Sequence, residues 1–443
     1  MKKHIIAGAC LLVAAGAANA LGLLQAYEAA LLNDPAYRAA QAEQEAGRQA
    51  APLGRSALLP TLAASVSNAA NRADLTSTDT SGQTVQSQPS YRSAAAVLSL
   101  RQPLFDLEGQ ARWRQGQAQA AYSEAVFAGK TQALLLRLVG AYADAQVAQD
   151  QLALAAAQRE TLAEQLRQNE RLLQQGAGTR TDVLETSAKV HLAEAQLIEA
   201  RDQLATALAT LAAIVGQDPM PLDKLAADVR SAALQPADVE DWKTIALAGN
   251  AEIAARRQAL EVASQEVDKS RAGHAPRLDL VASVGHSKAE AISSYNQSAT
   301  VRSIGLQLNI PLYSGGAVDA TLRQALARRD QAGAELELAT RAIDVELRKQ
   351  HGAVLSGAAR VEALAQAVDA ARVLTEATRQ SVKGGVRVNL DLLNAQAQVY
   401  SSQRDLARAR YDQLLSRLRL KLAAGTLDAT ELRAVAIQFT TPR

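Results

Sequence analysis

The side chains that most often carry chemistry are few in this 443-residue sequence. Its 5 histidines are scattered without metal-ligand spacing, at positions 4, 191, 274, 286 and 351. Cys10 is the only cysteine, and neither a nucleophile elbow nor a glycine-rich phosphate loop occurs. Lone histidines of this kind are most often surface residues. The sequence therefore predicts no catalytic, metal or cofactor site, and we expect that the protein is not an enzyme.

The composition favours long helices and argues against nucleic acid as a partner. The 47 Lys+Arg and 45 Asp+Glu leave a net charge of +2, whereas a general nucleic-acid binder carries a clustered basic excess. Apolar residues make up 48% but aromatic residues only 3%, and alanine, the best helix former, supplies much of the apolar share. No proline lies between Pro103 and Pro219 or between Pro311 and Pro442, as is typical of long helices.

Residues 1–20 have the pattern of a bacterial signal peptide. Lys2 and Lys3 form a basic start, an apolar core follows, and Ala18-Asn19-Ala20 is a small-x-small cleavage site. The apolar run is too short to span a bilayer, and Cys10 lies too early in it to be a lipid-attachment cysteine. No later stretch has the ~18 uncharged apolar residues of a membrane-spanning helix. We therefore expect export of a cleaved chain.

The sequence contains two copies of one unit. Four motifs recur at offsets of 208 to 216 positions: Leu59-Pro60-Thr61-Leu62 with Ala275-Pro276-Arg277-Leu278, Gln102-Pro103-Leu104-Phe105 with Ile310-Pro311-Leu312-Tyr313, Asp182-Val183-Leu184 with Asp391-Leu392-Leu393, and Gly216 with Gly425. Internal repeats of this kind indicate a duplicated fold. We predict a first repeat at 21–216, a connector at 217–241, a second repeat at 242–425 and a C-terminal tail at 426–443.

Each repeat contains one predicted β-hairpin, at about 60–103 and 276–311. Apolar and polar residues alternate in the strands, for example at Ile304, Leu306, Leu308 and Ile310. Strands of about ten residues suit a membrane, although a hairpin half-buried on a soluble core gives the same pattern. We favour the membrane because the rest of the chain offers no large apolar surface for a hairpin to cover. The segments 71–90 and 287–299 are rich in Ser, Thr, Asn and Gln, which is typical of external loops.

The rest of each repeat is predicted to be helical. Residues 108–174 contain no proline and would form a rod of ~100 Å. Two further stretches, 183–214 and 392–423, follow a heptad pattern in which larger apolar residues alternate with small ones three positions later. Heptads sustained over this length predict coiled coils, and the small residues predict close helix approach.

Four strands cannot close a barrel, and open sheet edges are not tolerated in hydrocarbon. Several copies must therefore share one barrel. Two copies would give eight strands with a filled interior, whereas three would give twelve, which is wide enough to conduct. The predicted fold class is an α+β membrane protein, with a duplicated coiled-coil tunnel of long helices and four strands per chain in a trimeric 12-stranded outer-membrane barrel.

The mature chain resembles the TolC family of outer-membrane channels over essentially its whole length. The resemblance rests on the following segments: Ala29-Ala30-Leu31-Leu32-Asn33-Asp34-Pro35, Leu58-Leu59-Pro60, the Pro-Leu-Phe and Pro-Leu-Tyr signatures, Gly385-Val386-Arg387-Val388-Asn389-Leu390-Asp391-Leu392-Leu393-Asn394, and Ala407-Arg408-Ala409-Arg410-Tyr411. It implies a homotrimer in outer-membrane lipid whose periplasmic tunnel docks an adaptor protein and an inner-membrane pump, either ABC-type or proton-driven. Such a channel exports proteins by type I secretion or small molecules.

The resemblance also implies a gate at the periplasmic end of the tunnel. Arg387 would pair with Asp182 on a neighbouring tip, next to Thr181, and Asp391 would form a ring of carboxylates at the constriction. Asn394 stands where the family has a second ring aspartate, and Val382 stands near the position of a network tyrosine. The alternative is that Asp182 and Asp391 only interact with helix dipoles as first-turn acids.

Two helical turns would form the adaptor-docking tips. They contain Gly176, Gly178, Gly384 and Gly385, and glycine tolerates the positive φ of tight turns.

The aromatic residues Phe105 and Tyr313 follow the equivalent prolines Pro103 and Pro311. We predict that both aromatics lie at the periplasmic edge of the bilayer.

Two other classes of protein fit the sequence less well. A periplasmic coiled-coil adaptor needs lipoyl-like and barrel domains that the sequence lacks, and a structural filament has no use for four alternating strands. The sequence does not identify the cargo or the pump.

Overall fold

The computed structural model describes residues 21–78, 80–219, 221–226, 233–290 and 297–440. The predicted signal peptide lies outside the described residues. The chain divides into two compact units, one formed by residues of 1–41, 128–250 and 341–443 and the other by 42–127 and 251–340. Each unit therefore takes residues from both predicted repeats.

Two pairs of long helices repeat along the chain with nearly equal lengths. The helices α4 (Leu107–Gln174) and α8 (Ala317–Lys383) have 68 and 67 residues, and α5 (Arg180–Val215) and α9 (Asn389–Ala424) have 36 each. The last two end at Gly216 and Gly425, which have φ values of 79° and 76°. This left-handed conformation ends a helix and favours glycine. The long helices predicted from proline-free stretches are thus confirmed.

The heptad positions of α5 and α9 face the protein interior. In α5 the small or apolar residues at 186, 190, 193, 200, 211 and 214 are buried. In α9 the same holds for 392, 395, 402, 406, 409, 420 and 423. Within the part of the chain that the structure describes, no helix combines the length and apolar composition needed to cross a bilayer.

Shorter elements complete the first unit around one large core. Tyr142 of α4 is fully buried there, its hydroxyl donates to the Leu21 carbonyl at 2.8 Å, and the same oxygen accepts from the Asp223 amide at 2.8 Å. Its ring meets Phe439 edge-on at 5.4 Å. The remaining elements of the chain are α1 (Leu23–Asn33), α2 (Pro35–Arg48), α3 (Ala50–Ser56), β5 (Lys224–Leu225), α6 (Val239–Gly249), α7 (Ala251–Arg271), η1 (Ala272–His274), α10 (Ala429–Ala436) and β8 (Phe439–Thr440).

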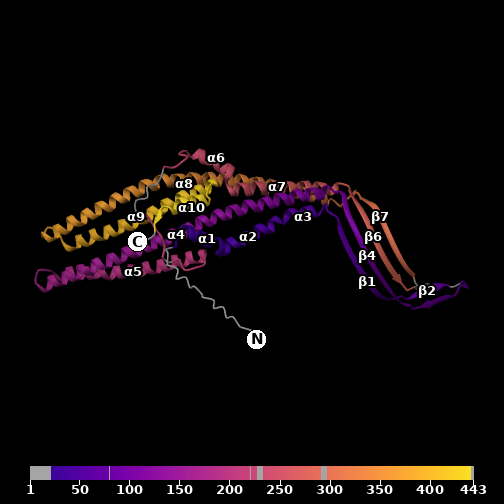
Figure 1. Cartoon of the computed structure of the whole chain (residues 1–443), viewed down its shortest axis with the longest axis horizontal. Coiled ribbons are helices and arrows are strands. Elements are labelled where there is room, and N and C mark those ends of the chain that lie inside the picture. Colours follow the sequence, from indigo (N-terminus) through magenta and orange to yellow (C-terminus); the bar gives the residue numbers. More distant parts are fainter. Residues whose placement is uncertain (1–20, 79, 220, 227–232, 291–296, 441–443) are drawn as a thin grey trace, which may run out of the picture. The chain divides into compact units, whose positions relative to one another are not determined.

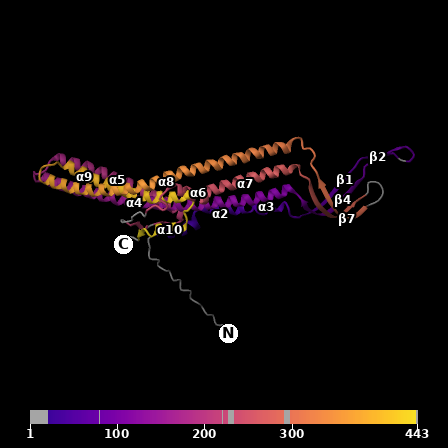
Figure 2. The ribbon, with the colours of Figure 1, turned by 90° about the horizontal axis from the view of Figure 1, so that it is seen from above.

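The second unit holds an antiparallel sheet of four strands in the order β1-β4-β6-β7. The strands are β1 (Thr61–Arg72), β4 (Ser90–Phe105), β6 (Arg277–Ala289) and β7 (Gln297–Asn309), and Figure 1 shows them side by side. The two hairpins predicted from alternation are confirmed, with strands longer than the expected ten residues. A small hairpin, β2 (Leu75–Thr78) with β3 (Thr84–Ser87), fills the first polar loop and extends past β1 and β4 in Figure 2. That hairpin was not predicted.

The two faces of the sheet differ in polarity. Register places even-numbered residues of all four strands on one face; for example, Leu62 lies opposite Leu100, which lies opposite Ala282. This apolar face carries exposed Leu62, Val66, Leu98, Val284, Ile304, Leu306 and Leu308. The opposite face carries mostly Ser, Ala, Gly, Val and Gln. A sheet with one exposed apolar face needs an apolar surrounding on that side, as membrane strands have.

A cluster of charged side chains lies at the end of the sheet where β4 leads into α4. Asp279 is 1% exposed and accepts from Arg101 at 2.6 Å and from Arg277 at 3.3 Å. Arg277 also lies 3.5 Å from Asp106, whose carboxylate accepts from the Gly109 amide at the start of α4. The cluster joins β4 of the first repeat to β6 of the second.

The two predicted interface aromatics do not occupy equivalent places. Pro103 lies within β4, where the β4–β6 register shifts between Pro103 and Phe105, and Phe105 is the last strand residue, opposite Leu278 on the apolar face. Tyr313 lies after β7 outside any strand and is 86% exposed. The equivalence expected from the repeat is therefore wrong at the level of local structure, because the bulge extends β4 past its proline.

Candidate gate and docking groove at the helical tips

The two tips have the same turn. Gly176 and Gly385, each with φ of 74°, end α4 and α8. At the first tip the amides of 176, 177 and 178 donate to the carbonyls of 173, 172 and 172, and at the second the amides of 385, 386 and 387 donate to those of 382, 381 and 381. This pattern satisfies the last carbonyls of each helix with a left-handed residue at the turn.

The other two tip glycines have different reasons to be small. Neither Gly178 nor Gly384 has a positive φ, so the prediction that both serve tight turns in this way is wrong for them. A Cβ at Gly178 would stand 3.0 Å from the Leu172 side chain and 3.0 Å from the Leu173 amide nitrogen, so a larger residue there would require the end of α4 to shift. A Cβ at Gly384 would only reach ordinary contact at 3.5 Å.

The helices that follow the turns begin differently. Thr179 caps α5: its hydroxyl oxygen accepts from the Asp182 amide at 3.1 Å, and the Asp182 carboxylate accepts from the Thr179 hydroxyl at 2.6 Å and amide at 3.3 Å. This is a capping box. Val388 stands at the equivalent position before α9 and offers no side-chain cap. The carboxylate of Asp391, the equivalent of Asp182, is not used in a cap.

A buried polar network joins the two helical hairpins just behind the tips. The Asn169 and Asn389 amides donate to the Thr186 hydroxyl at 2.9 and 3.1 Å, and that hydroxyl donates to the Asp182 carbonyl at 2.7 Å. Gln165 donates to Asn169 and Asn389 at 3.2 and 3.3 Å. Asn169, Thr186 and Asn389 are 6%, 0% and 7% exposed. Sequence reasoning missed this network, although Thr186 was a visible polar residue at a heptad core position.

A groove of about 1180 Å³ lies between the tips, lined by both hairpins. It brings together Thr181, Asp182, Gly178, Val382 and Arg387. Arg387 is exposed and makes no ion pair with a carboxylate that the structure describes. Asp391, Asn394, Gly176, Gly384 and Gly385 do not line this groove.

A charged pair lies on α8 before the turn of the second tip. Glu376 accepts from Gln380 at 2.9 Å and from Arg379 at 2.6 Å. The hydrogen bond from Gln380, followed by the charge of Arg379, holds the pKa of Glu376 below its ordinary range. Among the described residues, no three His, Cys, Asp or Glu side chains lie close enough to hold a metal ion.

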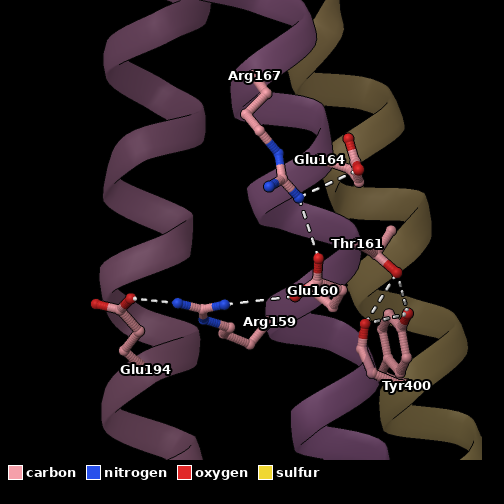
Figure 3. Close-up of polar contacts among 8 residues, drawn as sticks. Arg159, Glu160, Thr161, Glu164, Arg167, Glu194 and Tyr400 are labelled. Atoms are coloured by element: carbon pink, nitrogen blue, oxygen red, sulfur yellow. Dashed lines mark hydrogen bonds and ion pairs between the residues drawn. The ribbon is translucent and has the colours of Figure 1, made fainter.

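Farther from the tips, polar contacts tie α4 to α5 and α9 (Figure 3). The Tyr400 hydroxyl of α9 lies 2.9 Å from Thr161 and donates to the Ala157 carbonyl at 3.3 Å. Arg159 reaches Glu194 of α5 at 3.4 Å. A second arginine, Arg167, bridges Glu160 and Glu164 on the same helix at 3.0 and 3.2 Å. The contacts of Tyr400 and Arg159 thus join α4 to α9 and to α5.

Comparison with known proteins finds a family match over most of the chain. Residues 26–217 and 242–426 match the family described as "Outer membrane efflux protein". The chain is 44% identical to the alkaline protease secretion protein AprF of Pseudomonas aeruginosa, covering 98% of this chain and 90% of that protein. It is 38% identical to the proteases secretion protein PrtF of Dickeya chrysanthemi, covering 99% and 95%.

The fold has also been seen in solved structures. The CmeC outer membrane channel of Campylobacter jejuni superimposes with a TM-score of 0.79, at 16% identity, covering 94% of this chain and 89% of that one. At that identity the likeness concerns the fold alone. Together with the family match and the two full-length relatives, it settles the classification: the chain belongs to the outer membrane efflux protein family and is an outer-membrane export channel with a long periplasmic helical portion, and not an enzyme.

Proposed function

We propose that this channel exports proteins, proteases among them, as the outer-membrane component of a type I secretion system. One observation carries the proposal: the two relatives named for protease secretion are 44% and 38% identical to this chain over nearly its whole length. The description of the family as efflux proteins supports a second candidate, the export of small molecules.

A deletion strain complemented with the wild-type gene separates the two candidates. We expect that deletion abolishes extracellular protease activity and that the protease is retained inside the cells. Accumulation of a fluorescent efflux dye should not change. Unchanged extracellular protease together with raised dye accumulation would contradict protein secretion and favour the efflux function.

The proposed assembly is a homotrimer that docks a periplasmic adaptor and an inner-membrane ABC or proton-driven pump. The sheet supports this assembly because β1 and β7 are its edge strands, and unpaired backbone groups are not tolerated in lipid. Pairing of β7 in one copy with β1 in the next would remove both edges, so three copies would contribute twelve strands. The groove between the tips is the surface that we assign to the adaptor.

The proposed gate consists of Arg387, Asp182 and Thr181 beside the groove and of Asp391 with Asn394 one turn into α9. Asp391 is half-buried and Asn394 exposed on that helix. Three copies of Asp391 would form one carboxylate ring, since Asn394 supplies no second ring. In planar bilayers, Asp391→Ala should reduce cation preference and block by a trivalent cation, whereas Asn394→Ala should change neither. Equal effects of the two substitutions would remove Asp391 from the gate.

A further inference from the structure

One half of the four-stranded sheet lies away from the strand ends that connect to α4 and α7, and we call it the outer half. The described lysine and arginine residues of this half all lie on the apolar face of the sheet. We call this set the basic belt: Arg72, Arg92, Lys288 and Arg302. In the register, Lys288 lies opposite Ala94, and Arg302 lies opposite Val284, which lies opposite Leu98. The belt therefore shares its face with the exposed leucine, isoleucine and valine side chains. The opposite face of the described strands carries no charged residue in this half.

The belt follows the end of the apolar band from strand to strand. On β7 the apolar residues end at Ile304 and Arg302 follows, whereas on β4 they reach Ala94 before Arg92. The band is tallest at β4, where it extends ten residues, from the row of Leu278 and Phe105 to the row of Lys288 and Ala94. Ten residues span ~33 Å along a strand. With the usual tilt of membrane strands this corresponds to a band about 25 Å tall, the height of the hydrocarbon layer that such strands cross.

The direction of the chain fixes which side of the membrane the belt occupies. β4 continues into α4 and β6 follows α7, so the first row of the band is on the side of the periplasmic helices. The belt is at the other end, next to the loops that begin after β1 and β6. In an outer-membrane protein this places Arg72, Arg92 and Lys288 at the headgroups of the outer leaflet. Arg302 lies four residues nearer the helices, below them on the apolar face.

The belt side chains are available for a ligand. All four are exposed, and none makes an ion pair with a carboxylate among the described residues. The acidic residue nearest in register is Glu290, whose carboxylate accepts from the Arg92 backbone amide at 2.8 Å. An exposed row of cations above an apolar surface complements an amphiphile that has anionic headgroups and acyl chains. Phosphate groups suit arginine in particular, because its guanidinium offers paired donors.

We propose that the basic belt binds the phosphate groups of the phosphorylated glycolipid in the outer leaflet, with the acyl chains lying on the apolar face below. The proposal concerns the lipid surroundings of the channel and holds whichever cargo it exports. It identifies a ligand class and a site that the channel function alone does not require.

The test compares lipid binding by the purified full-length channel and by an Arg72→Gln, Arg92→Gln, Lys288→Gln triple variant. The probe is purified outer-membrane lipopolysaccharide, and the readouts are its affinity in detergent and the amount that co-purifies. Each removed charge should weaken binding about fivefold, so the triple variant should bind about a hundredfold more weakly. The matched control is Arg201→Gln, Arg323→Gln, Arg360→Gln, which removes three exposed charges from the helices α5 and α8 and should bind like the wild type.

Two further binding experiments distinguish phosphate carried by the lipid from free inorganic phosphate. Enzymatically dephosphorylated lipopolysaccharide should bind the wild type as weakly as the intact lipid binds the triple variant, and inorganic phosphate should not compete at millimolar concentration. Equal binding by the triple variant and the control would overturn the proposal, as would full competition by free phosphate. If the triple variant does not assemble, Lys288→Gln alone should still show the fivefold loss.

Discussion

The first and second helical tips have the same backbone turn but are stabilised in different ways. Gly176 and Gly385 share the same φ and the same pattern of amide-to-carbonyl bonds. The first tip is then closed by its own capping box between Thr179 and Asp182. The second has Val388 in place of the threonine, and its next residue, Asn389, instead bonds to Thr186 of the other hairpin.

The two helix starts are therefore stabilised by different contacts, one within its own turn and the other between the two hairpins. The first tip can hold its shape alone, whereas the start of α9 depends on a neighbour. The carboxylates of the two equivalent acids, Asp182 and Asp391, also differ in their contacts. The carboxylate of Asp182 is engaged within its own turn, which agrees with the first-turn role considered from the sequence, and the carboxylate of Asp391 is left for another purpose. The two copies of the duplicated unit thus share one turn and differ in how the helix after it is stabilised.

Removing the contact between hairpins should have the largest effect. Thr186→Val removes the acceptor that the buried amides of Asn169 and Asn389 share. Asn169 keeps its longer bond to the Asp182 carbonyl at 3.4 Å, whereas the Asn389 amide loses its bond across the hairpins, at about 1–3 kcal/mol. Hydrogen exchange, followed by mass spectrometry, should become at least tenfold faster at the start of α9 and less so at the start of α5. Thr206→Val, on an exposed position of α5, is the matched control and should change neither. Equal acceleration at both helix starts would contradict the dependence of the second tip on the first.

The shared turn predicts the next largest effect. Gly385→Ala and Gly176→Ala force a Cβ into a left-handed conformation, at about 1–2 kcal/mol each. Gly384→Ala meets no such strain and only ordinary contacts, so it should be nearly neutral. The measurement is the thermal midpoint of each variant, together with crosslinking to the adaptor. Equal losses at Gly384 and Gly385 would show that the tip tolerates no added methyl for a reason other than φ.

Restoring the missing cap should make the second tip resemble the first. Val388 has φ of −94° and ψ of 158°, which is the backbone conformation of a capping residue, and Asp391 stands three residues later as Asp182 does after Thr179. Val388→Thr should therefore stabilise the start of α9 by about 1 kcal/mol, and Thr179→Ala should destabilise the start of α5 by a similar amount. Local hydrogen exchange measures both. If Asp391 serves the gate, Val388→Thr should also weaken cation preference by engaging its carboxylate; stabilisation with unchanged selectivity would argue that Asp391 has no such role.

Much of this architecture could be predicted because it depends on periodic patterns. Apolar spacing of two and seven residues, proline-free stretches and recurring glycines led to the sheet strands, the long helices and the turns at Gly176 and Gly385. The reason for Gly178 could not be predicted, since it arises from the approach of Leu172 in space. The Thr186 network depends on partners from three helices, one of them more than 200 positions away. The β2–β3 hairpin was missed because its strands are only four residues long.

The smallest expected effect concerns Arg387, the residue that tests whether the tips also form the gate. Arg387 is exposed, and its equivalent in the first tip is Gly178, so only the second tip offers a cation here. If it pairs with Asp182 of a neighbouring copy, each exposed ion pair contributes about 0.2–1 kcal/mol. We expect the lower part of that range, because the Thr179 cap already engages the Asp182 carboxylate. Three such pairs would then sum to about 1 kcal/mol, which is about fivefold in a closed–open equilibrium.

Arg387→Ser should raise the open probability of single channels in planar bilayers by that factor without disturbing assembly. Arg180→Ser removes an exposed arginine from the first tip and should leave gating unchanged. If both substitutions open the channel equally, the response is to lost positive charge at the tips, and Arg387 does not hold the gate.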